Sequence, residues 1–264
     1  MMRVHALVAK EFLDIRRNRG ALLAVAVVTI ISVTLPFVIA VGIPTLTGQP
    51  LAEDSDLMKV SATAGTAAGL SADAQIQLFL FQQFLLLFLL TPITGGMALA
   101  AHAIVGEKQA RTLEPLLATP ATTTELLLAK IVGALVPTLV ISLAGLAVYV
   151  GGIAALAEPG VLAAMLTWRT ALLMLFLGPA AALVSLQAAI VISSRVNDAR
   201  TAQQFGVLIV LPLTAVIVAQ FIGAFWLSPR MIVMIGIGLI AVWIVLTLVS
   251  VALFDRESIL TRWR

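Results

Sequence analysis

The chain has 264 residues, of which 61% are hydrophobic and only 11% are charged, and its mean hydropathy is +1.11. An average soluble domain has about 25% charged residues, so this composition excludes a water-soluble globular domain. The absence of cysteine excludes disulfides, thiolate metal sites and cysteine nucleophiles. The net charge of +3 does not indicate nucleic-acid binding, because the basic residues cluster at the edges of apolar runs.

The first 20 residues predict an amphipathic helix. Its apolar positions recur at helical spacing and are Val4, Leu7, Val8, Phe12 and Ile15. Its charged positions on another face are Arg3, Lys10, Asp14 and Arg17. We expect this helix to lie along the inner membrane surface, either as an anchor alone or also as a contact for a cytoplasmic partner.

Six uncharged or nearly uncharged runs are long enough to span a bilayer, which takes about 20 residues as a helix. They are residues 21–43, 78–105, 126–153, 170–193, 205–227 and 231–254. The last two are separated only by residues 228–230, which predicts a tight hairpin. Lys130 falls one turn inside the third run, where we expect its ammonium group to reach the membrane surface. The fold class is therefore an all-α protein with six transmembrane helices in one domain over residues 1–264.

The distribution of basic residues predicts the orientation. With the N-terminus inside, all 16 Lys and Arg residues fall on the cytoplasmic side except Lys59, Arg169 and Arg230. Six spans then also place the C-terminus in the cytoplasm, in a cell membrane. Residues 44–77 become an acidic extracytoplasmic loop that has room for a short helix and is either a substrate gate or a solvated connection.

The sequence contains no phosphate-binding loop, no paired acids and no histidine cluster, so we expect no catalytic residue, cofactor or metal site. No acidic residue lies in the middle of a span, which argues against an ion-coupled carrier. Four polar residues in the spans are candidates for a translocation path: Gln82, Gln83, Thr91 and Gln187. They could equally form hydrogen bonds that hold helices together.

The segment between the second and third spans, residues 106–125, is the most informative. It mixes charged residues with three leucines, which predicts a short helix with one embedded face, and Pro120 ends it. Thr122 and Glu125 predict a capping box at the start of the next helix. Glu107 and Arg111 stand four residues apart and could pair across one turn.

These residues resemble a known family. Glu107-Lys108, Thr112-Leu113-Glu114, Leu116-Leu117, Thr119-Pro120 and Lys130 are similar to the cytoplasmic signature of ABC type-2 permeases. A second, weaker similarity covers residues 193–203, with Arg195, Asp198 and Arg200. The resemblance implies a membrane subunit, of an exporter in the first instance, that works with two copies of a separate cytoplasmic ATPase and with a second permease copy, identical or related.

The resemblance also implies the residues that couple the chain to the ATPase. They are Glu107, Lys108, Arg111, Thr112, Leu113, Glu114, Leu116 and Leu117. The alternative is a multi-pass scaffold or assembly factor without a substrate path, which would explain six spans and a docking loop equally well.

Overall fold

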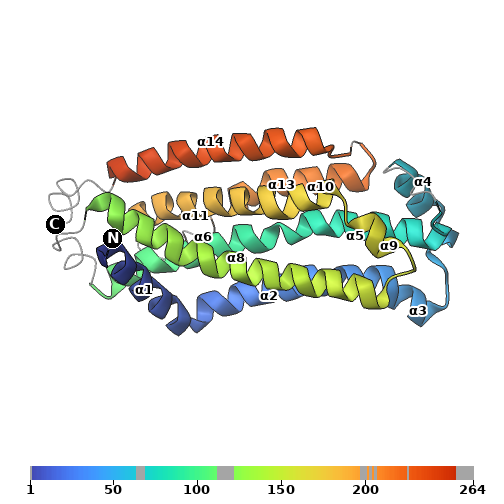
Figure 1. Cartoon of the computed structure of the whole chain (residues 1–264), viewed down its shortest axis with the longest axis horizontal. Coiled ribbons are helices and arrows are strands. Elements are labelled where there is room, and N and C mark those ends of the chain that lie inside the picture. The colour runs from blue at the N-terminus through green and yellow to red at the C-terminus, as the bar shows by residue number, and fades with distance from the viewer. Residues whose placement is uncertain are drawn as a thin grey trace.

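The computed structural model describes residues 2–63, 69–111, 122–196, 201, 204, 207–224 and 226–253. Over these residues every regular element is a helix, and most helices run along the long axis of an elongated bundle (Figure 1). The N-terminal helix α1 (Met2–Arg17) lies at one end, which we call the proximal end. The short helices α3 (Ile43–Thr47), α4 (Ser55–Thr63) and α9 (Val161–Met165) lie at the opposite, distal end.

The first long helix follows α1 after a single-residue corner. The Asn18 side chain accepts a hydrogen bond from the Ala21 amide at 3.1 Å and so caps α2 (Arg19–Phe37). The π-helical segment η1 (Val38–Gly42) and α3 continue it without a break to Thr47. The helix is therefore longer at both ends than the predicted span 21–43.

The predicted loop 44–77 contains regular structure. It carries η2 (Leu51–Glu53) and α4, and the Asp73 carboxylate accepts a hydrogen bond from the Ala52 amide at 2.8 Å. The next long helix then starts at Ala72 rather than at residue 78, and runs as α5 (Ala72–Phe88) and α6 (Leu90–Gln109), interrupted only at Leu89.

The third long helix is α8 (Thr123–Leu156), followed by α9 and by α10 (Trp168–Ala171). The π-helical segment η3 (Leu172–Leu177) joins α10 to α11 (Gly178–Arg195). The Thr122 side chain and the Glu125 side chain each bond the backbone of the other residue, which confirms the capping box.

The predicted fifth span, 205–227, is wrong at its distal end. The helix α13 (Val207–Phe221) stops at Phe221, and α14 begins only at Pro229 and runs to Leu253. The connection is therefore longer than the three-residue hairpin 228–230. Of the described helices, five are long and apolar enough to cross a membrane, and Leu211–Phe221 is a shorter apolar helix.

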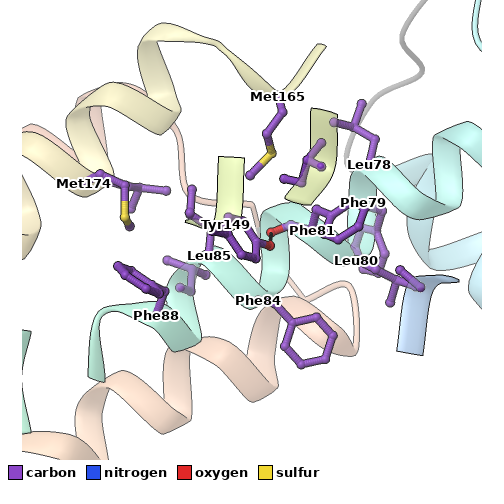
Figure 2. Packing of buried hydrophobic residues seen from close by; sticks show 14 of the residues in the cluster. Leu78, Phe79, Leu80, Phe81, Phe84, Leu85, Phe88, Tyr149, Met165 and Met174 are labelled. Carbon is purple, nitrogen blue, oxygen red and sulfur yellow. Dashed lines mark hydrogen bonds between the residues drawn. The ribbon is translucent and has the colours of Figure 1, made fainter. Parts of the chain in front are cut away.

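The helix formed by α5 and α6 is the centre of the bundle. In its most apolar window 83% of the residues are buried, against 11% in α14, whose apolar side chains face outward. Tyr149 of α8 is fully buried, and its hydroxyl donates a hydrogen bond to the Phe81 carbonyl at 2.8 Å. Figure 2 shows this packing, with Phe81 and Phe88 beside the Tyr149 ring. A buried centre with outward apolar faces is the arrangement of a polytopic membrane protein.

Candidate coupling site

Three helices meet around Lys130 at the proximal end. The ammonium nitrogen of Lys130, on α8, lies 3.2 Å from Glu11 Oε1 of α1 and 2.6 Å from Glu107 Oε2 of α6. It also donates to the Ala103 carbonyl at 3.1 Å. Lys10 of α1 completes the group by pairing with Glu107. We call Lys10, Glu11, Glu107 and Lys130 the proximal charge cluster.

The cluster is buried and electrically balanced. Glu11, Glu107 and Lys130 are only 4%, 7% and 4% exposed, and two lysines face two glutamates. Buried charges are tolerated when they are paired, whereas removing one partner leaves an uncompensated charge in a medium of low dielectric constant. Lys130 therefore holds α1 and α6 on α8 through these ion pairs.

Close backbone packing positions Glu11. A Cβ atom added at Gly133, one turn after Lys130, would lie 2.6 Å from Glu11 Cβ, so only glycine lets α1 approach α8 this closely. Ile15 of α1 packs in the same apolar cluster as Leu127 and Ile131 of α8. The amphipathic helix thus directs its apolar face at the bundle, and Glu11 enters that face with its charge satisfied.

Lys10 lies at the edge of the cluster. Its ammonium group is also 3.3 Å from Asp14 Oδ2, one helical turn further along α1. Burial alone would lower the pKa of Lys10, but the hydrogen bond and charge of Glu107, with the charges of Glu11 and Asp14, outweigh it and raise the pKa above its ordinary value. Lys10 therefore stays charged at neutral pH, which keeps the cluster balanced.

A cleft of about 390 Å³ adjoins the cluster between α1 and the end of α6. Lys10, Asp14 and Glu107 line it, together with Asn18 and His102. Asp14 is half exposed, so the cleft presents charged side chains at the proximal surface.

Lys108, the next residue after Glu107, points to another helix. Its ammonium nitrogen donates to the carbonyl oxygens of Ser193, Ser194 and Val196 at 2.7, 3.0 and 3.1 Å. These carbonyls belong to the last turn of α11 and to the residue after it, where helices leave acceptors without internal partners. Glu107 and Lys108 together fasten the end of α6 to α1, α8 and α11.

Arg111, two residues after the end of α6, has an unusual backbone conformation. Its φ is +54°, in the left-handed region that residues with a side chain rarely adopt, and its amide donates to the Lys108 carbonyl at 3.1 Å. The predicted pair of Glu107 with Arg111 is not formed; Glu107 pairs with Lys10 and Lys130 instead.

The other predicted coupling residues lie outside the described part of the chain. They are Thr112, Leu113, Glu114, Leu116 and Leu117, and in the second loop Asp198 and Arg200. Arg195 is the last residue of α11.

The four candidate path residues lie at different levels of the bundle. Gln82 and Gln83 are on α5, Thr91 is fully buried at the start of α6, and Gln187 is fully buried on α11. The Gln187 amide donates to the Ser250 hydroxyl of α14 at 2.6 Å, which favours helix association for this residue. A translocation path through the four stays a prediction.

Sequence reasoning missed Lys10 and Glu11 as partners of the coupling segment, although a signal was present. Glu11 interrupts the apolar series Val4, Val8 and Ile15 at helical spacing, and Lys130 interrupts an apolar run. An acid and a base that each occupy an apolar position need partners of opposite charge. Pairing the two would have predicted that α1 docks on α8.

The long apolar helices, their outward apolar faces and the buried proximal charge cluster define a multi-pass membrane protein. A family profile described as ABC-2 family transporter protein matches residues 5–232. The chain belongs to this family and is a permease subunit of the ABC transporter class. A comparison with curated proteins finds no match.

Proposed function

We propose that the chain is an export permease of the cell membrane that is driven by two copies of a separate cytoplasmic ATPase and pairs with a second permease copy. Family membership over residues 5–232 supports this proposal. The basic residues support an orientation with both termini in the cytoplasm, which makes the proximal end the cytoplasmic end.

In the proposed mechanism, the contacts at the proximal end transmit movement from the ATPase to the helices. Glu107 and Lys108 stand in the last turn of α6, shortly before the segment from Arg111 to Leu117, which we propose docks on the ATPase. A displacement of that segment passes to α1 and α8 through Glu107 and to α11 through Lys108. In proteins, such coupling is transmitted by packed elements that switch between two discrete arrangements.

The proposed docking surface has two parts. The first consists of Arg111 and the residues that follow it: Thr112, Leu113, Glu114, Leu116 and Leu117. The second consists of Arg195, Asp198 and Arg200 after α11. Because Lys108 bonds the end of α11, the beginnings of the two parts are held next to each other.

The test is affinity purification of the tagged chain from its native membrane in mild detergent, with an ATPase assay on the co-purifying proteins. We expect a stoichiometric soluble chain with ATPase activity. Its recovery should fall several-fold with Arg111→Glu or Glu114→Lys, while both variants still insert into the membrane. Lys59→Glu is the control, since it also inverts a charge but lies exposed on α4 at the distal end.

Failure of any nucleotide-hydrolysing partner to co-purify, in repeated gentle conditions, would favour the scaffold alternative. Undiminished recovery with both Arg111→Glu and Glu114→Lys would instead move the docking surface elsewhere on the chain. The first result tests whether an ATPase partner exists, and the second tests where on the chain it binds.

A further inference from the structure

Arg169 is buried at the distal end without an acidic partner among the described residues. It is 8% exposed; its Nε donates to the Leu227 carbonyl at 3.0 Å and its Nη1 to the Gln82 side-chain oxygen at 3.4 Å. The guanidinium carbon lies 4.2 Å from the centre of the Trp226 ring. Its remaining nitrogen, Nη2, is buried and makes no hydrogen bond within the described structure. A buried cation with a free donor is costly unless an anion pairs with it.

Two buried amides lie in the same region. Gln83 of α5 and Gln220 of α13 are at most 1% exposed, and neither side chain has a hydrogen-bond partner among the described residues. Phe79, one turn from Gln83, contacts both Trp226 and Phe221, the residue after Gln220. These ring contacts connect Trp226, which stacks on Arg169, with the sequence neighbours of Gln83 and Gln220. Three buried polar side chains with free donors or acceptors indicate a site for a polar group.

An apolar pocket lies next to these polar side chains. It has a volume of about 160 Å³ and is lined only by apolar residues of α5, α6, η3, α11, α13, α14 and the connection before α14. Leu86 and Val216, which line it, stand one helical turn from Gln82 and Gln220, and Leu227 both lines it and accepts the Arg169 hydrogen bond. Apolar cavities near 150 Å³ stay dry and bind small apolar molecules. The pocket therefore accommodates a short stretch of one hydrocarbon chain.

The pocket reaches the surface between α13 and α14. Pro212 of α13 and Ile235 of α14 both line it and are exposed. Packing explains this opening, because α13 packs chiefly on α5, whereas α14 packs on α11 and η3. A ligand can thus enter from the side that apolar residues expose to the membrane.

We propose that Arg169, Gln83 and Gln220 bind the anionic headgroup of a membrane amphiphile whose hydrocarbon chain occupies this pocket. Charge complementarity determines the headgroup, since Arg169 has a free N–H donor and a positive charge that a neutral group would leave uncompensated and a cationic group would repel. A carboxylate and a phosphate ester share this chemistry, so a fatty acid and an anionic phospholipid are the two sources to distinguish. The site is formed within a single chain and requires no ATPase.

The experiment uses Trp226 as the reporter. Trp168, Trp243 and Trp263 are replaced by Phe, and the sole-tryptophan chain is placed in phosphatidylcholine nanodiscs. Bromine quenches tryptophan fluorescence at close range, so the probes are dibromostearate, its neutral methyl ester and dibromostearoyl phosphatidylglycerol. We expect saturable quenching by an anionic probe, with the methyl ester at least about tenfold weaker, because the charge-assisted hydrogen bond is lost. The anionic probe whose quenching saturates shows whether the ligand is a fatty acid or an anionic phospholipid.

Matched variants test the two halves of the site. Arg169→Gln should weaken the anionic probe about tenfold, whereas Arg230→Gln, which removes an exposed charge at the same end, should change nothing. Ala181→Phe fills the pocket, leaves every polar group in place and should also abolish saturation. Equal quenching by the methyl ester, or unchanged affinity in Ala181→Phe, would overturn the proposal. Because purified chain alone is used, these results are independent of the proposed ATPase partner.

Discussion

Lys130 Nζ lies 3.2 Å from Glu11 Oε1, although the two residues are 119 positions apart in the chain. Both side chains are at most 5% exposed. The N-terminal helix is therefore attached to the bundle by a buried ion pair as well as by apolar contacts. The same lysine binds Glu107 immediately before the proposed docking segment, so the attachment of α1 and the position of that segment depend on each other.

Lys130→Met should destabilise the chain by about 3–5 kcal/mol, because it leaves Glu11 and Glu107 buried with only Lys10 to compensate them. Thermal unfolding in detergent measures the loss. Lys59→Met is the control, since the Lys59–Asp56 pair is exposed and contributes at most about 1 kcal/mol. Adding Glu11→Gln and Glu107→Gln to Lys130→Met should recover part of the stability. Equal effects of the two lysine substitutions would show that the cluster does not stabilise the fold.

Gly133→Val should displace α1 from α8, since its Cβ would meet Glu11 at 2.6 Å. The chain has no native cysteine, so a single cysteine at Ile15, a buried position, reports the displacement by maleimide labelling. We expect slow labelling in the single-cysteine chain that keeps Gly133. With Gly133→Val, labelling should be at least about tenfold faster, which corresponds to about 1.4 kcal/mol or more in the free energy of opening α1 from α8. Gly151→Val on the same helix is the control, because nothing lies within 4 Å of its added Cβ.

Lys108→Met should loosen the end of α11, since the carbonyl oxygens of Ser193, Ser194 and Val196 lose a charged donor. Hydrogen exchange of peptides that cover the last turn of α11 should accelerate several-fold, while exchange in the middle of α8 stays unchanged. Lys108→Arg should restore much of the protection. Unaltered exchange at α11 in Lys108→Met would mean that the bonds of Lys108 do not hold this helix end.

Local patterns in the sequence were sufficient for the helical fold and for part of the coupling site. Apolar run length predicted the long helices, and the Thr122–Glu125 spacing predicted a capping box that the structure confirms. These features depend on residues close in sequence. The partners of Glu107 could not be predicted in the same way, since Lys10 and Lys130 reach it from separate helices.

The distal end shows why the rest was not predictable. Hydropathy extended the fifth span to residue 227, because Trp226 and Leu227 are as apolar as the helix before them. In the structure both belong to the connection, where they pack on Phe79 and bond Arg169. Arg169 was expected in the connection between the third and fourth spans, on the extracytoplasmic side, and the structure shows that its side chain is buried there. Tertiary contacts, rather than composition, decide both positions.

The length of α8 has a consequence for the membrane that surrounds the protein. Its 34 residues extend over about 51 Å, whereas the hydrocarbon layer of a bilayer is about 30 Å thick. If α8 is centred and upright, Lys130 lies about 14 Å from the midplane, at the boundary between hydrocarbon and headgroups. A thicker membrane would draw the ion pairs of Lys130 into lipid, and a thinner one would expose them to water. The strength of the link between α1, α6 and α8 should therefore vary with lipid chain length, which makes the membrane itself a determinant of coupling.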